Sequence, residues 1–178
     1  PDWCVLDLDP KGAAFTDVVK IALAIRALCD EIGLPSYPKT SGSTGLHVLV
    51  PLGRQLTFEQ CRHFAEFLAT VIVKRLPAIA TIERAIPKRK GRVYVDFLQN
   101  GHGKLIVAPF SVRPVPGATV STPLGWNDVK RGLNPTKITI RTVPARLTRR
   151  KNDPMAPVVD ESPDLLAAVE RLSTMLAG

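Results

Sequence analysis

Residues 15–32 carry apolar side chains at the spacing of one helix face, and this stretch constrains the fold more than any other. The stripe consists of Val18, Val19, Ile21, Ala22, Ile25, Leu28, Cys29 and Ile32. Gly33 and Pro35 follow it as stop signals. The pattern predicts an amphipathic helix whose apolar side needs a sheet or other helices to cover it.

Short strand patterns surround this helix. Residues 3–9 alternate in polarity, which places Asp7 and Asp9 on one face of a strand. An extended piece at 36–40 leads through a Gly-rich loop into a second strand pattern at 46–52. The first third of the chain is therefore expected to combine a helix with a sheet.

The rest of the chain continues this alternation. Thr57 caps a second apolar helical stripe, and strands are expected at 93–98 and 105–107, joined like a hairpin. A Pro- and Gly-rich segment at 111–126 predicts an ordered loop, and Ser162 caps a terminal helix. Without an internal repeat, all 178 residues are expected to form one domain of the α+β class.

The charge balance narrows the classes of partner. The chain has 24 Lys and Arg against 16 Asp and Glu, a formal net charge of +8, which favours nucleic acid or a nucleotide over a small neutral substrate. Cys4, Cys29 and Cys61 form no Cys-x-x-Cys pair, so they predict neither a disulfide framework nor a zinc site and fit a reducing cytosol. No apolar run approaches the roughly 18 residues that cross a bilayer, so no membrane partner is expected.

Three carboxylates in strand patterns are the strongest chemical signal. Asp7 and Asp9 project from one face, where their oxygens can share one or two hard cations. Asp96 lies inside another apolar strand pattern, where an acid without a partner is anomalous. Three acids on strands suit two-metal phosphoryl transfer. A simpler interpretation stays open, in which Asp9 caps the turn at Pro10 and Asp7 is solvated.

The segment Ser41-Gly-Ser-Thr-Gly-Leu-His47 has the composition of a phosphate-binding loop. Its glycines permit close backbone approach, and its hydroxyl and amide groups supply hydrogen-bond donors. His47 follows the loop, where it can donate to a phosphate, and Arg113 is an isolated cation suited to clamp one. A plain tight turn and a structural histidine are the competing interpretations.

Two basic runs are further candidates for phosphate contacts. The first is Lys88 to Arg92, and the second consists of Arg146, Arg149, Arg150 and Lys151. Contacts to DNA phosphates would make binding salt-dependent, and their loss would reduce that dependence. A solvated positive face explains any single one of these residues equally well.

The chain resembles the archaeo-eukaryotic primase superfamily in three ordered motifs, Asp7-Leu-Asp9-Pro10, Ser41 to His47, and Val95-Asp96-Phe-Leu-Gln-Asn100. It is also similar, at Gly33 to Gly42, Gly91 to Asp96 and Thr142 to Leu147, to the polymerase domain of bacterial ATP-dependent DNA ligase D. This resemblance covers essentially the whole chain. It implies a primase-polymerase catalytic core with an RRM-like, mainly antiparallel sheet and packed helices.

The resemblance also implies an activity, that of a nucleotidyltransferase of the DNA polymerase or primase type. Such an enzyme adds nucleotides at DNA ends in bacterial nonhomologous end-joining repair. The metal ligands and catalytic residues for two Mg²⁺ or Mn²⁺ ions would be Asp7, Asp9 and Asp96.

Further site residues and partners follow from the same resemblance. The incoming triphosphate would be held by Ser41, His47 and Arg113, with Arg89 and Gln99 as other polar residues of the pocket. The implied partners are DNA ends, nucleoside triphosphates with ribonucleotides preferred, Ku and a DNA ligase module. The implied location is the bacterial cytoplasm at the nucleoid.

Two departures from the family pattern affect these expectations. Thr44 stands where the family commonly has Lys, so one cationic phosphate contact is expected to be absent, with Lys39 as the candidate to replace it. Family members also have a substantial portion before the first aspartates. We therefore expect a truncated or reduced form of the domain, with its metal site present and its DNA contacts incomplete.

Two other functions compete with the polymerase. A noncatalytic module that binds DNA or Ku would keep the basic surface without completing a polymerase site. An aspartate-nucleophile phosphatase would use the Asp-x-Asp strand alone, but Pro10-Lys11 does not match the residues that follow the aspartates in that family.

Overall fold

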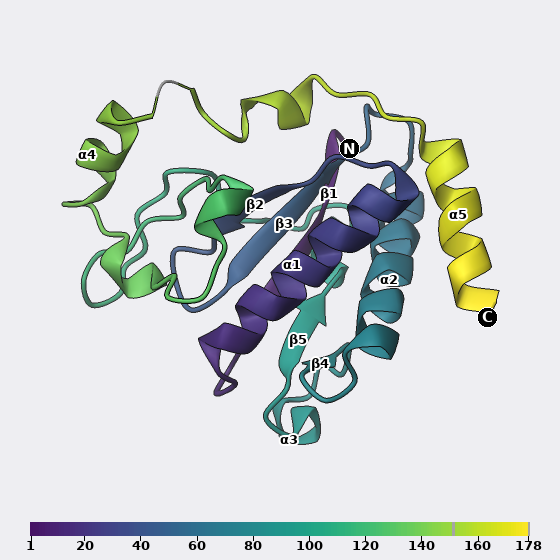
Figure 1. Cartoon of the computed structure of the whole chain (residues 1–178), viewed down its shortest axis with the longest axis horizontal. Helices are drawn as coiled ribbons and strands as arrows, with labels where there is room; N and C mark the ends of the chain where they lie inside the picture. Colours follow the sequence, from purple (N-terminus) through teal and green to yellow (C-terminus); the bar gives the residue numbers. More distant parts are fainter. Residues whose placement is uncertain (151, 178) are drawn as a thin grey trace.

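The computed structural model describes residues 1–150 and 152–177, and its centre is a five-stranded sheet in the order β2-β3-β1-β5-β4 (Figure 1). The strands are β1 (Trp3–Asp9), β2 (Tyr37–Thr40), β3 (Leu46–Pro51), β4 (Ala80–Thr81) and β5 (Val93–Asp96). All neighbours pair antiparallel except β4 and β5, which are parallel. The expected α+β class with a mainly antiparallel sheet is confirmed. Lys151 of the second basic run lies outside the described residues.

The two long helices form where their apolar stripes predict them. The first, α1 (Phe15–Ile32), buries the same eight residues that define its stripe, and Gly33 ends it in the left-handed region at φ 79°. The second, α2 (Phe58–Arg75), begins with a capping box in which the Thr57 hydroxyl accepts from the Gln60 N–H at 3.2 Å. Phe58, the first residue of α2, is exposed and packs edge-on against the ring of His102.

The two faces of the sheet have different chemistry. On β1, Cys4, Leu6 and Leu8 are fully buried in the main core together with residues of α1 and α2. Successive side chains of a strand point to opposite faces, so Asp7 and Asp9 project from the face that these helices leave free. The sheet therefore presents one apolar face to the helices, and its other face carries the carboxylates beside a smaller apolar cluster that contains Val5 and Leu49.

The expected strand at 105–107 is wrong. The chain leaves β5 through a short 3₁₀ turn at Leu98–Asn100, residues 105–107 belong to no strand, and Leu105 is exposed. The pairing of β5 explains this, because β1 and β4 occupy both of its edges and leave neither to a hairpin partner at 105–107. Beyond β5 the amide of Asn100 bonds to β1 instead, with Oδ1 accepting from the Val5 N–H at 2.7 Å and Nδ2 donating to the Val5 carbonyl at 2.8 Å.

Several short elements were not predicted from the sequence, because each is too short to show a periodic pattern of apolar residues. They are β4, α3 (Ile86–Arg89), α4 (Val143–Thr148) and the 3₁₀ turns at Trp126–Asp128, Pro135–Lys137 and Ala156–Val159. The terminal helix α5 (Leu165–Ala177) is present, but Asp164 rather than Ser162 caps it, with Oδ1 accepting from the Ala167 N–H at 3.1 Å.

The loop at 111–126 is ordered, as expected. Val112 bridges to Val120 within it, and Pro123 bridges to Lys39 at the outer edge of β2. The three cysteines are buried and free. Among the described residues, the helices are all too short or too polar to cross a membrane.

Candidate active site

Asp7 and Asp96 lie directly opposite each other in the antiparallel pairing of β1 and β5. Residues in such positions project from the same face, and two like charges there repel each other. Asp9, two residues further along β1, shares this face. The backbone thus brings together the three carboxylates that the sequence singled out.

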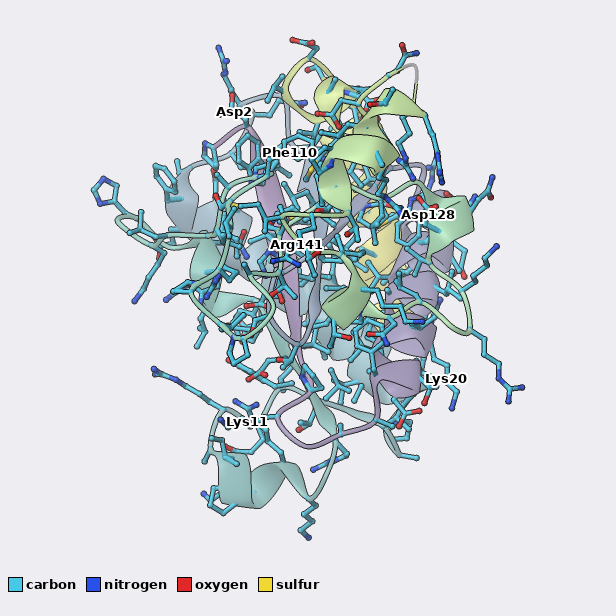
Figure 2. All side chains as sticks on the ribbon, turned by 90° about the vertical axis from the view of Figure 1, so that its left-hand side faces the viewer. Asp2, Lys11, Lys20, Phe110, Asp128 and Arg141 are labelled. Atoms are coloured by element: carbon cyan, nitrogen blue, oxygen red, sulfur yellow. The ribbon has the colours of Figure 1, made fainter. Side chains whose placement is uncertain are left out.

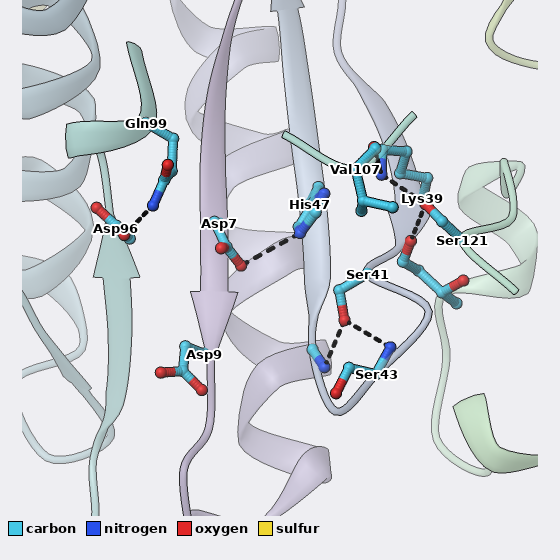
Figure 3. Close-up of polar contacts among 12 residues, drawn as sticks. Asp7, Asp9, Lys39, Ser41, Ser43, His47, Asp96, Gln99, Val107 and Ser121 are labelled. Carbon is cyan, nitrogen blue, oxygen red and sulfur yellow. Dashed lines mark hydrogen bonds and ion pairs between the residues drawn. The ribbon is translucent and has the colours of Figure 1, made fainter. Parts of the chain in front are cut away.

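Hydrogen bonds hold Asp96 in place. Its Oδ1 accepts from the Leu98 N–H at 2.8 Å and from the Tyr94 hydroxyl at 3.1 Å. Its Oδ2 accepts from Nε2 of Gln99 at 3.0 Å (Figure 3). Burial, followed by the charge of Asp96, raises the pKa of Tyr94 above its ordinary value. Sequence reasoning overlooked Tyr94, although its place two residues before Asp96 in a strand puts both side chains on one face.

Asp9 is held by Arg89, whose Nη1 donates to Oδ2 at 2.8 Å. The Arg89 side chain is only 8% exposed, and it also donates to the Arg84 carbonyl and stacks on the Tyr94 ring at 4.5 Å. A solvated positive face therefore does not describe this member of the first basic run. Arg89 instead fixes the orientation of a site carboxylate.

His47 lies opposite Asp7 on the other side, in β3, and its Nε2 is 3.4 Å from Asp7 Oδ1. The side chain is 3% exposed, and Nδ1 is buried without a hydrogen-bond partner in the described part of the chain. Burial lowers the pKa of His47, with Lys39 and Arg113 adding to this effect and Asp7 opposing it. A neutral imidazole that faces Asp7 therefore supports the carboxylate, and its contact with a phosphate stays a prediction.

The loop after β2 is closed by Ser41. Its Oγ accepts from the backbone N–H groups of Ser43 and Gly45 at 3.1 and 3.0 Å (Figure 3). Gly42 has φ 71°, and a Cβ there would lie 2.7 Å from the Ser121 nitrogen. At Gly45 a Cβ would collide with the Leu8 carbonyl oxygen of β1. These glycines let the loop lie directly against the sheet beside the carboxylates.

A pocket of about 240 Å³ joins the loop to the carboxylates. Of the predicted site residues it is lined by Asp7, Asp9, Ser41, His47, Gln99 and Arg113. The other two border it through contacts, Arg89 on Asp9 and Asp96 on Gln99. Thr44, at the position of the expected lysine, also lines it.

Arg113 is the free cation of this pocket. Unlike Arg89, its side chain makes no hydrogen bond or ion pair with any residue that the structure describes. Its backbone is fixed, because its N–H donates to the Thr119 carbonyl at 2.8 Å and the Thr119 hydroxyl donates to the Gly42 carbonyl at 2.6 Å. An unpaired guanidinium held at this rim can receive a phosphate.

Lys39, the candidate to replace the family's lysine at position 44, is buried and hydrogen-bonded within the fold. Its side chain is 1% exposed, and Nζ donates to the Val107 carbonyl at 2.9 Å and to the Ser121 Oγ at 2.6 Å (Figure 3). Burial lowers the pKa of Lys39 to about 7. Lys39 thus ties β2 to the segments at 105–107 and 119–122, which form a wall of the site.

The carboxylates offer the oxygen donors that Mg²⁺ and Mn²⁺ prefer. Asp7 Oδ2 and Asp9 Oδ1 accept no hydrogen bond from the described residues, so they are available as ligands. Among those residues, however, no three acidic, His or Cys side chains converge on a common point, because Asp9 turns to Arg89 and Asp96 to Gln99. The donor chemistry fits a divalent cation once these carboxylates rotate towards Asp7.

Comparisons with known proteins agree with the fold and the motifs. The chain is 36% identical over 152 residues to the bifunctional non-homologous end joining protein LigD of Bacillus subtilis, covering 84% of this chain and 25% of that protein. It is 31% identical over 173 residues to the multifunctional LigD of Pseudomonas aeruginosa, covering 96% of this chain and 21% of that protein.

A solved structure also matches the fold of this chain. The polymerase domain of Mycobacterium tuberculosis ligase D, in complex with DNA, superimposes with a TM-score of 0.82 at 30% identity. The match covers 91% of this chain and 56% of that one. The family model of the LigD primase-polymerase domain matches residues 1–155. The chain therefore belongs to the LigD primase-polymerase family.

Proposed function

We propose that this chain is a nucleotidyltransferase that adds nucleotides at DNA ends in nonhomologous end joining. The observation that carries the proposal is the register of the sheet. It sets Asp96 and His47 on either side of Asp7, on the face that also bears the Ser41 loop and Arg113. The carboxylates that would hold metal ions and the donors that would bind phosphates thus line or border one pocket.

In this proposal Asp7, Asp9 and Asp96 hold two divalent cations, Mg²⁺ or Mn²⁺. The ions would supply charge stabilisation for the attacking and leaving oxygens of an in-line displacement. Arg89 holds Asp9, and Tyr94, Leu98 and Gln99 hold Asp96. Both carboxylates would turn from these partners towards Asp7 when the ions bind.

The phosphates of a nucleoside triphosphate would contact the Ser41 loop and Arg113. The Ser41 oxygen already accepts two backbone N–H groups, so its own hydrogen is free to donate. Arg113 supplies a guanidinium fork that can bind a phosphate with two parallel hydrogen bonds. With Thr44 in place of lysine, Arg113 carries most of the positive charge at this end of the pocket.

The partners proposed are DNA ends, ribonucleoside triphosphates in preference to deoxyribonucleotides, Ku and a ligase module. The comparisons support DNA ends, since two relatives are named as non-homologous end joining proteins and the structural neighbour is in complex with DNA. A bacterial cytoplasmic protein at the nucleoid fits these partners.

The test is nucleotide addition to a DNA duplex with a 3′ overhang, with Mn²⁺ present. The wild-type chain should extend the end, and Asp7→Asn should not. Asp160→Asn, which removes an exposed carboxylate remote from the pocket, serves as the matched control and should extend normally. DNA binding that is salt-sensitive but indifferent to Mn²⁺ and nucleotide, with no extension, would favour the noncatalytic module instead.

A further inference from the structure

Four arginines gather around α4, outside the candidate active site. They are Arg141, Arg146, Arg149 and Arg150, named here the α4 arginine cluster, and they line a pocket of about 500 Å³. In Figure 1, α4 lies beyond the β2 edge of the sheet, on the side away from α2 and α5. Figure 2 labels Arg141 and Asp128 on that side of the molecule.

Local structure fixes where the four side chains lie. Arg146 lies in α4, Arg149 caps the C-terminal end of this helix and Arg150 follows directly, and all three line the same pocket. The hydroxyl of Thr142 donates to the Lys137 carbonyl at 2.7 Å and accepts from the Thr139 N–H at 2.9 Å. These bonds hold the chain entering α4, and therefore the backbone of Arg141.

Asp128 is the acidic residue of this pocket, and it forms ion pairs with two of the four arginines. Its Oδ2 accepts from Arg150 and lies 3.1 Å from Nη2 of Arg146. Burial opposes ionisation of this carboxyl, but the Gly125 N–H and then the two arginines hold its pKa below the ordinary value. Four positive charges thus face one negative charge, an excess of three.

A purely structural role does not explain the other two arginines. Holding α4 against the turn at Trp126–Asp128 requires only Arg146 and Arg150. Arg141 and Arg149 are exposed and make no hydrogen bond or ion pair with the part of the chain that the structure describes. Arg146 Nε and Nη2 are buried and make no hydrogen bond there, although Nη2 is within ion-pair distance of Asp128. Like charges at these spacings repel, so the cluster is suited to an anionic ligand.

The cluster is also connected to the candidate active site through the loop at 111–126. A neighbouring pocket of about 280 Å³ shares Arg146 and Arg150 with the cluster and is lined on its other side by Phe110, Thr122 and Pro123. The same loop carries Arg113 at the nucleotide pocket. The loop at 111–126 therefore borders both the nucleotide pocket and the pocket beside the cluster.

We propose that the α4 arginine cluster binds phosphates of the DNA backbone, as a site separate from the nucleotide pocket. The inference rests on the proposed function, which supplies DNA as the substrate. Guanidinium groups match phosphate geometry, and a cleft with one sign of charge concentrates a polyanion at its surface. DNA contacts at α4 would hold the substrate without contacting the reacting atoms.

The test compares the salt dependence of duplex DNA binding between two double variants. Arg141→Gln with Arg149→Gln removes the two unpaired charges and leaves the Asp128 contacts intact. The control, Lys20→Gln with Arg62→Gln, removes two charges from α1 and α2 that line neither pocket of the cluster. Arg141→Lys with Arg149→Lys keeps the charge, and thermal unfolding verifies that every variant folds.

The expected result is specific to the cluster. Each lost phosphate contact lowers the slope of log affinity against log salt by about 0.9, so the cluster variant should lose about 1.8. The lysine variant should keep most of the slope, and the control should keep all of it. Binding of a nonhydrolysable triphosphate should be equal in all four chains.

The outcomes separate this inference from the proposed function. If the cluster variant and the control have equal slopes while the wild type binds DNA and extends it, only the cluster inference is overturned. If the cluster variant loses triphosphate binding, its arginines belong to the nucleotide site and the inference is wrong. If the wild type shows no salt-dependent DNA binding, the inference and the DNA-directed function fail together.

Discussion

Asp7 of β1 and Asp96 of β5 occupy directly opposite positions in an antiparallel strand pair. Two carboxylates at such positions cost stability, because their charges repel and neither donates a hydrogen bond to the other. Removing one of these charges should therefore raise the free energy of unfolding and, at the same time, lower the rate of nucleotide addition.

Asp7→Asn is expected to raise the free energy of unfolding by about 0.5 kcal/mol. The amide oxygen can still accept from His47, so that contact is kept. Nucleotide addition should fall at least about 100-fold, as expected when one stabilising group is lost from a transition state. Denaturant unfolding and primer extension measure the two effects. Lower stability together with full activity would show that the carboxylate is structural.

Arg89→Gln should destabilise the fold by about 2 kcal/mol, because a buried guanidinium loses its bonds to Asp9 and to the Arg84 carbonyl. Lys88→Gln is the matched control, since Lys88 lies in the same basic run but is exposed. Thermal unfolding of both variants makes the comparison. Equal effects of the two substitutions would mean that the basic run behaves as one solvated surface.

Arg113→Gln should leave stability within about 0.5 kcal/mol of the wild type, because Arg113 has no side-chain partner among the described residues. Its affinity for a nucleoside triphosphate should fall about tenfold or more, since a charge-assisted, bidentate contact is lost. Arg131→Gln, at an exposed position away from the pocket, should change neither quantity. Calorimetric titration would refute the assignment if triphosphate affinity were unchanged.

Lys39 should make stability depend on pH. Burial lowers its pKa to about 7 in the folded chain, against 10.5 as its ordinary value. Between these values the unfolded state holds a proton that the folded state has released, so stability rises with pH, by up to about 1.4 kcal/mol per pH unit.

Lys39→Met lacks this titration. The free energy of unfolding of the wild type minus that of the variant should therefore grow between about pH 7 and about pH 9. Unfolding curves of both chains across this window test the expectation. A constant difference would show that Lys39 stays charged when it is buried.

The sequence predicted the elements whose buried and exposed side chains follow a regular period. The stripe of α1 and the alternation of β1 are regular patterns, so their bounds and buried faces follow from spacing. The motifs also named the residues that the pocket brings together, because their order along the chain resembles that of a known family.

Features that depend on single long-range contacts could not be predicted from the sequence. The pattern at 93–107 predicts a hairpin, whereas the Asn100 amide bonds to Val5 of β1 where β5 has ended. Arg89 was one cation among four in a basic run, and only the fold shows it buried against Asp9. Such partners are distant in sequence and leave no periodic signal.

The most direct test of the central claim is a calorimetric titration of Mn²⁺ into the wild-type chain with a nonhydrolysable nucleoside triphosphate present. The account predicts saturable binding of two ions together with the nucleotide, abolished in Asp7→Asn and kept in Asp160→Asn. Absence of Mn²⁺ binding to the wild type, or equal binding to the wild type and Asp7→Asn, would contradict it.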